Sequence, residues 1–90
     1  MTWGRWAAYA AAVTARERDR AERLYRLVGL EIRRLREAGD RTQKDLAAAI
    51  GRSRTTVTNV ESGHQRLPLH QLLEVADELG VAIVGVPRPA

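Results

Sequence analysis

The side chains between residues 54 and 59 are of the types that read base edges in duplex DNA. If this segment is helical, Val57 and Val60 point to one side at about 100° per residue, and polar residues cluster on roughly the opposite side. These are Arg54, Thr55, Thr58 and Asn59, none of them acidic. In the major groove arginine pairs with guanine, asparagine pairs with adenine, and threonine offers a hydroxyl and a methyl group. An ordinary solvated helix face has a similar composition, so the surrounding sequence must decide between the two interpretations.

Positive charge is concentrated around this segment. The chain has a formal net charge of +4 and a pI near 10.6. Residues 41–66 carry five cations against two acids, a net +3: Arg41, Lys44, Arg52, Arg54 and Arg66 against Asp45 and Glu61. Residues 71–90 carry one cation against three acids, a net −2. A basic middle and an acidic end favour one face for a polyanion and another face for a different contact.

Several kinds of function have no support in the sequence. The 90 residues suit one domain, and there is no cysteine for a disulfide, a zinc ribbon or a thiol nucleophile. His64 and His70 stand without a carboxylate–histidine pattern, and no glycine-rich phosphate loop or nucleophile elbow is present. No apolar run reaches membrane-spanning length, and the alanine-rich residues 6–13 are too short for a signal peptide. We therefore expect a cytoplasmic protein that is not an enzyme and has no cofactor, no metal site and no membrane contact.

Helix start and stop signals divide the chain. Residues 3–38 have apolar residues at spacings of three and four, as in a helix that is continuous or broken. Thr42 and Asp45 form a capping box that opens a second helix, which ends at Gly51. Ser53 caps a third helix that runs to Ser62. The short turn between the second and third helices is typical of a helix-turn-helix.

The C-terminal part carries a fourth helix and an apolar tail. Pro68 opens this helix and Gly80 ends it. Residues 81–86 are apolar and rich in β-branched side chains, and two prolines follow them, so we expect a short strand here.

An aromatic stripe at the N-terminus leaves two alternatives open. Trp3, Trp6 and Tyr9 recur at a spacing of three. They either pack on the core or contact a second copy or a partner protein, since tryptophan is enriched in interface hot spots.

Residues 36–81 resemble the phage repressor and Cro type of helix-turn-helix, the XRE-like family. The matching residues are Arg36-Glu37, Thr42-Gln43, Leu46-Ala47, Gly51, Ser53, Val57, Glu61-Ser62-Gly63 and the segment Leu72-Leu73, Ala76, Leu79-Gly80-Val81. The resemblance implies a mainly α fold with a lambda-repressor-like helix-turn-helix domain at residues 24–81. An N-terminal helical extension at residues 1–23 precedes it. The tail at residues 82–90, with its short β-strand, replaces the family's fifth helix.

The resemblance also implies roles for individual residues. Base contacts fall on Gln43, Arg54, Thr55, Thr58 and Asn59, and the alternative for Gln43 is contact with a phosphate or with a residue that itself contacts a base. Phosphate contacts fall on Arg41, Lys44, Arg52, Ser53, Thr56, His64 and Arg66. Arg36 and Glu61 are expected to form an ion pair that holds the third helix against the first.

Together these features predict a transcriptional regulator that binds double-stranded DNA, most simply a repressor acting as a homodimer on a pseudo-palindromic operator. A lone strand leaves backbone groups unpaired, so we expect the tails of two copies to pair through Val81, Ile83, Val84 and Val86. The alternative is an antitoxin-type DNA-binding protein that also holds a protein partner through its termini.

Overall fold

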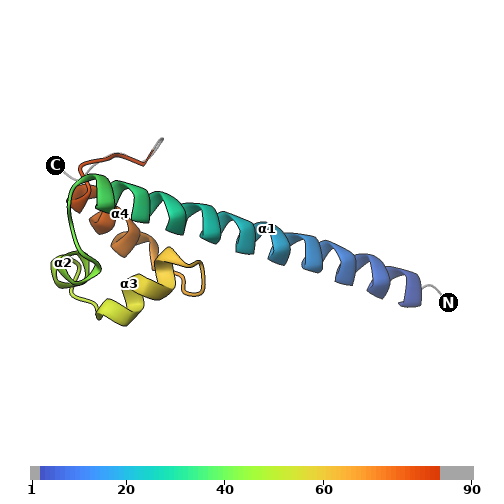
Figure 1. Cartoon of the computed structure of the whole chain (residues 1–90). Coiled ribbons are helices and arrows are strands. Elements are labelled where there is room, and N and C mark those ends of the chain that lie inside the picture. The colour runs from blue at the N-terminus through green and yellow to red at the C-terminus, as the bar shows by residue number, and fades with distance from the viewer. Residues whose placement is uncertain (1–2, 84–90) are drawn as a thin grey trace.

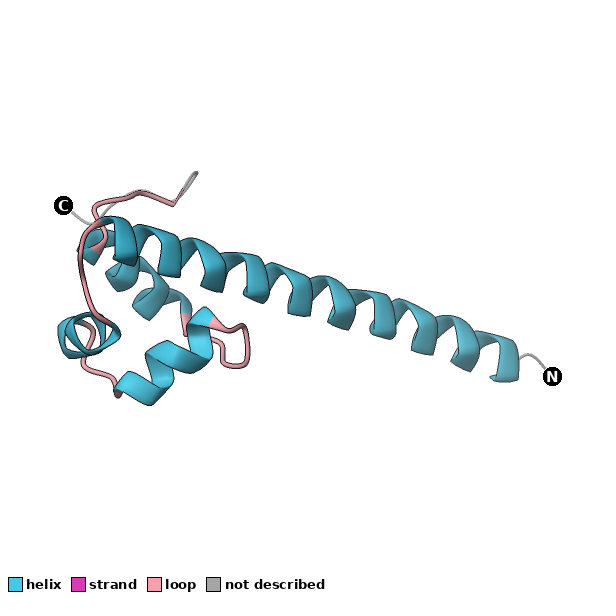
Figure 2. Cartoon of the chain, viewed as in Figure 1, coloured by secondary structure: helices cyan, strands magenta, loops and turns pink. Residues whose placement is uncertain are grey.

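Four α-helices make up the part of the chain that is described. The computed structural model describes residues 3–83, apart from the side chains of Trp3 and Trp6. Its helices are α1 (Trp3–Ala38), α2 (Gln43–Ala49), α3 (Arg54–Glu61) and α4 (Leu69–Glu78). In Figures 1 and 2 the helices α2, α3 and α4 gather beside the C-terminal half of α1, while its N-terminal half extends away from them. The predicted mainly α fold is confirmed, and α1 is continuous.

Local hydrogen bonds fix the ends of the two central helices. The Thr42 hydroxyl accepts the Asp45 backbone N–H at 3.0 Å, and the Asp45 carboxylate accepts the Thr42 N–H at 3.0 Å. This is the predicted capping box, and it lowers the pKa of Asp45 because the carboxylate accepts the backbone hydrogen bond. Gly51 then takes a φ of +68°, which lets α2 end in a tight turn. Ser53 caps α3 by accepting the Thr56 N–H at 3.1 Å.

All four helices contribute to one small core. Its most deeply buried member is Leu46 of α2, which is 1% exposed. Around it lie buried apolar side chains from every helix: Ile32 of α1, Ala47 of α2, Ile50 after it, Val57 and Val60 of α3, and Val75 of α4. Each large apolar side chain buried in this way contributes about 1.5–3 kcal/mol to folding. The core therefore fixes α2 and α3 against the C-terminal half of α1.

A glycine allows α1 and α3 to approach closely. A Cβ placed on Gly29 would collide with the backbone carbonyl oxygens of Val60 and Glu61 at the end of α3. Glycine is unfavourable in a helix interior because of its conformational freedom. Here the cost is offset by a contact that no larger residue permits.

The strand predicted at residues 81–86 is not found at residues 81–83, the part of this segment that the structure describes. Residues 81–83 have no strand structure, and residues 3–83 contain no strand at all. Instead the Val81 N–H donates to the Ala76 carbonyl at 2.9 Å, closing the end of α4 beside Gly80. Val81 and Ile83 line an apolar groove against α1 and α4. Val84 and Val86 lie outside the described residues, and the proposed pairing of two tails has no support.

Of the N-terminal aromatic residues, only Tyr9 shows whether its side chain packs on the core. Its side chain is 59% exposed, so it does not pack on the core. The side chains of Trp3 and Trp6 lie outside the described part. None of the helices in residues 3–83 combines the length and the apolar character that a membrane span requires.

Candidate nucleic-acid interface

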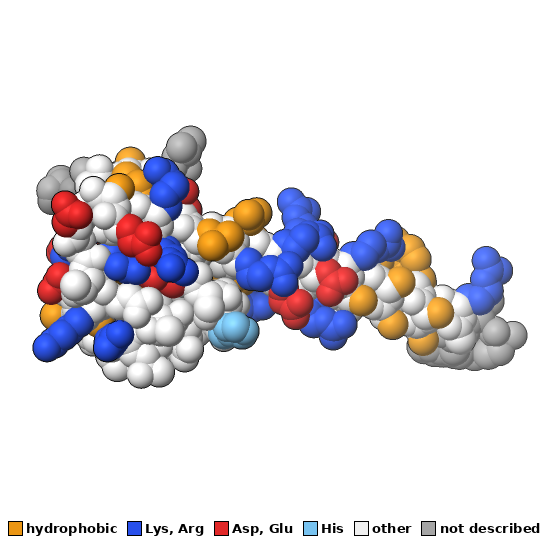
Figure 3. Space-filling view, in the orientation of Figure 1, with side chains coloured by type: hydrophobic (Ala, Val, Ile, Leu, Met, Phe, Trp, Pro, Cys, Tyr) orange, Lys and Arg blue, Asp and Glu red, His pale blue; other side chains and the backbone are white. Residues whose placement is uncertain are grey.

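The outward side of α3 is polar and its inward side is apolar. Val57 and Val60 are 3% and 7% exposed, whereas Arg54, Thr55 and Thr58 are exposed and Asn59 is half-buried. We call these four polar residues the reading face. Figure 1 shows α3 at the edge of the bundle away from most of α1. On the side drawn in Figure 3, this lower part of the bundle is mostly white, with blue side chains at its left end.

A buried ion pair joins α3 to α1. Arg36 and Glu61, expected to pair, are 8% and 6% exposed and make two hydrogen bonds. Arg36 Nε donates to Glu61 Oε2 at 2.7 Å, and Nη2 donates to Oε1 at 3.0 Å. Arg36 Nη1 also donates to the Arg41 carbonyl at 2.7 Å. These bonds to Glu61 raise the pKa of Arg36 above its ordinary value, so its guanidinium stays charged.

Gln43 extends this pair to the reading face. Its Nε2 donates to Glu61 Oε1 at 3.1 Å, and its Oε1 accepts the Thr58 hydroxyl at 2.9 Å. Arg36, Glu61, Gln43 and Thr58 thus form one chain of hydrogen bonds, which we call the Arg36–Thr58 network. Gln43 was expected to contact a base. Its side chain is half-buried between α2 and α3, where it fixes the position of Thr58.

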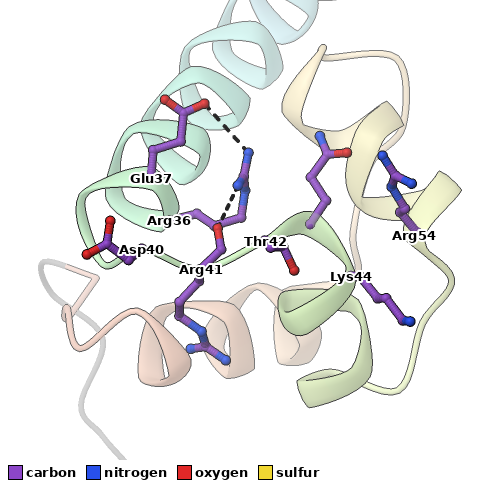
Figure 4. Close-up of a pocket in the computed structure, with 8 residues that line it drawn as sticks. Arg36, Glu37, Asp40, Arg41, Thr42, Lys44 and Arg54 are labelled. Atoms are coloured by element: carbon purple, nitrogen blue, oxygen red, sulfur yellow. Dashed lines mark hydrogen bonds and ion pairs between the residues drawn. The ribbon is translucent and has the colours of Figure 1, made fainter.

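Two cations border an open pocket beside the reading face. The pocket has a volume of about 670 Å³, and Lys44 and Arg54 are among the residues that line it. Figure 4 shows that Lys44 comes from α2 and Arg54 from α3, and that both side chains lie on the same side of the bundle. Both are exposed. This geometry suits contact with a phosphate backbone that passes across the ends of α2 and α3.

Two residues predicted to contact phosphate are occupied elsewhere. Arg41 turns toward α4, as Figure 4 shows, and donates to the Glu78 carbonyl at 2.7 Å and to its carboxylate at 3.2 Å. Thr56 is 9% exposed, with its hydroxyl 3.0 Å from Ser53 Oγ. This burial leaves little of the Thr56 side chain open to a phosphate, and its predicted contact stays a prediction. Sequence spacing missed the Arg41–Glu78 contact because it depends on tertiary packing, whereas Thr56 meets Ser53 three residues away within the cap of α3.

The remaining predicted phosphate contacts lie at both ends of α3. Ser53 is exposed at its N-terminal end, and Arg52 beside it donates to Gln71 Oε1 at 3.0 Å. Beyond its C-terminal end His64 is exposed, with Nδ1 2.8 Å from Ser62 Oγ.

Tyr25 is a residue that sequence reasoning did not find. The guanidinium of Arg66 lies over its ring, 4.5 Å from the centroid. This contact holds the loop after α3 against α1, and nothing in the spacing of the two residues indicates it.

Comparison with known families agrees with this geometry. A family model described as helix-turn-helix matches residues 32–86, which is more than half of the chain and includes α2, α3 and α4. No curated protein matches the chain. The extent of the family match, together with a capped α2, a tight turn and an outward polar face on α3, shows that the chain belongs to the XRE-like helix-turn-helix family of DNA-binding regulators.

Proposed function

We propose that this protein is a sequence-specific transcriptional repressor that binds double-stranded DNA as a homodimer on a pseudo-palindromic operator. The observation that carries the proposal is the reading face, which points outward on α3, with only Asn59 half-buried, while Val57 and Val60 anchor the same helix in the core. The Arg36–Thr58 network holds this helix from behind, so its polar side chains are pre-positioned for a major groove.

The side chains divide into two roles. Arg54, Thr55 and Asn59 read bases, and Thr58 reads them with Gln43 fixing its hydroxyl. Lys44, Arg52 and Ser53 hold phosphates at one end of α3, and His64 and Arg66 hold them at the other. Phosphate contacts set the orientation on the duplex, whereas base contacts supply the sequence preference.

Repression follows from occupancy. A protein that covers promoter DNA excludes the polymerase without catalysis or a cofactor, so we infer that the chain is not an enzyme. We also infer that it acts in the cytoplasm, where it can reach the chromosome. One α3 reaches only a few base pairs, so specific binding requires a second copy. In a dimer the two reading faces occupy half-sites about 34 Å apart, one turn of the duplex.

Selection from a random pool of duplexes tests this proposal. We expect the selected DNA to contain a two-fold symmetric motif, and the protein to bind it at least about a thousandfold more tightly than a shuffled duplex. Equal affinity for the selected and the shuffled duplex would contradict the proposal.

A further inference from the structure

The exposed side of α1 carries a stripe with a coiled-coil spacing. Residues at alternating intervals of three and four lie on one face, and we call them the pairing stripe: Ala10, Val13, Glu17, Arg20, Leu24 and Leu27. Leu24 and Leu27 are 56% and 64% exposed. Figure 3 shows orange side chains toward both ends of the projecting part of α1 and charged side chains between them.

A single copy gives this half of α1 little support. It projects beyond α2, α3 and α4 in Figure 1, so it does not pack on the bundle. In proteins most of the stability of a helix comes from tertiary packing of an amphipathic face rather than from intrinsic propensity. Two large exposed leucines on the same helix face therefore indicate a surface that another element covers.

We propose that the α1 helices of two copies pair in antiparallel orientation, with the two-fold axis between residues 18 and 19. In this register Val13 of one copy lies opposite Leu24 of the other, and Ala10 lies opposite Leu27. In both of these apolar pairs, the smaller side chain of one copy thus faces a leucine of the other. At the centre, Glu17 of each copy faces Arg20 of the other, which gives two opposite-charge pairs.

The charges exclude the other orientation. In a parallel pair in register, Glu17 would face Glu17 and Arg20 would face Arg20, and like charges at such positions are destabilising. Only the antiparallel register makes the stripe complementary to itself in both charge and size. The occupant of this face is therefore a second copy of the chain.

The same pairing places the two bundles at a spacing that suits two half-sites on one duplex, and this step rests on the proposed function. The pairing stripe and the residues of α1 that face the bundle, such as Tyr25, Gly29 and Ile32, are roughly a third of a turn apart at about 100° per residue. Both bundles therefore lie on the same side of the helix pair. Residue 32 of one copy is about 40 Å from residue 32 of the other along the helix axis, at 1.5 Å per residue. That separation is close to the ~34 Å between successive half-sites.

The register also accounts for the apolar groove between α1 and α4. This groove has a volume of about 460 Å³, and its apolar lining includes Val28, Leu35, Leu72, Leu79 and Ile83. Residues 3–6 of the second copy come level with residues 31–34 of the first, which places the start of one α1 beside the groove of the other.

Molar mass measured by light scattering, without DNA, tests the pairing. We expect the full chain to be a dimer and the Leu24→Glu/Leu27→Glu double variant to be a monomer that still shows cooperative unfolding of the bundle. Leu69→Glu is the matched control, because Leu69 of α4 is also 64% exposed but lies outside the stripe, and it should remain a dimer. A monomeric parent chain overturns the proposal, as does a double variant that is still a dimer.

Charge exchange and cross-linking test the register. Glu17→Arg and Arg20→Glu should each weaken the dimer, and the two together should restore it. The chain has no cysteine, so any disulfide that forms must join the introduced cysteines and shows which positions lie opposite each other. A mixture of Val13→Cys and Leu24→Cys chains should form a disulfide between them. Val13→Cys alone should not, because its two copies would be about 16 Å apart along the axis and a disulfide requires Cα atoms within about 7 Å.

A disulfide in Val13→Cys alone would show parallel pairing and overturn the proposal. Because these measurements contain no DNA, a failure of the DNA-binding proposal leaves their outcome unchanged. The two proposals can therefore fail separately.

Discussion

Glu61 is an acidic side chain on the helix that we propose enters the DNA groove, and its burial removes the conflict with phosphate. Its carboxylate accepts two hydrogen bonds from Arg36 and one from Gln43. The charge is neutralised inside the bundle, and the exposed side of α3 is left without an acid. The sequence could predict the pair by resemblance, but it could not show that Gln43 joins the pair to Thr58.

Removing one partner of this pair should destabilise the protein strongly. Arg36→Ala leaves the Glu61 carboxylate buried and unpaired, which typically costs about 3–5 kcal/mol of unfolding free energy. Arg33→Ala is the matched control, because Arg33 pairs with Glu37 on the surface, with side chains 61% and 54% exposed. Exposed pairs contribute about 0–1 kcal/mol. Urea denaturation compares the two, and equal losses would show that the buried pair has no special role.

Arg54 and Lys44 should differ in what they contribute to DNA binding. Arg54→Ala should cost about 1–3 kcal/mol of binding free energy and relax the preference at one base pair in each half-site. Lys44→Ala should weaken binding to all duplexes alike, because a phosphate contact carries no sequence information. Selection from a random pool of duplexes with each variant measures the base preference at every position of the motif. An unchanged motif with Arg54→Ala would place the base contacts on other residues.

At the scale of the elements, the helices were predictable because their ends are local. The Thr42–Asp45 capping box lies within four residues, and so does the cap that Ser53 gives to α3. The strand prediction failed because a strand requires a distant partner, and apolar residues at 81–83 satisfy the same pattern by packing beside α1 and α4. The burial of Thr56 and the turn of Arg41 toward Glu78 also depend on distant contacts.

The contact between α1 and α3 predicts contrasting effects for two glycines of the same helix. Gly29→Ala would push the Cβ into the carbonyl groups of Val60 and Glu61, so we expect a loss of about 1–3 kcal/mol, as for overpacked cores. Gly4→Ala meets nothing within 4 Å and should be neutral or stabilise the helix by up to about 1 kcal/mol. Thermal unfolding distinguishes them. If Gly29→Ala melts like the parent, the two helices are not in this close contact.

At the scale of the whole molecule, the charge distribution predicts a strong salt dependence of DNA binding. A dimer that makes about six to ten phosphate contacts should lose roughly 10³–10⁵ in affinity between about 50 and 200 mM salt. Lys44, Arg52 and Arg54 around the N-terminal end of α3 supply much of this charge. Fluorescence anisotropy at several salt concentrations gives the slope. A flat response would show that this surface does not hold the phosphate backbone.

The overall shape is the feature that sequence reasoning anticipated least. A helical extension at residues 1–23 was predicted, but its periodicity alone allowed packing on the core as well as an interface. The structure shows one helix of 36 residues that leaves the bundle, with Tyr9 exposed (Figure 1). Helical periodicity defines which residues share a face. It does not define what that face contacts.

The most direct test of the central claim is a map of the surface that DNA contacts. Amide chemical shifts of the ¹⁵N-labelled protein would be followed while the selected duplex is added. We expect the largest changes at residues 52–59 of the turn and α3 and at Gln43 and Lys44 of α2, with small changes in the core and in the projecting half of α1. Large changes confined to α1, with α3 unaffected, would contradict the claim that the protein reads DNA through α3.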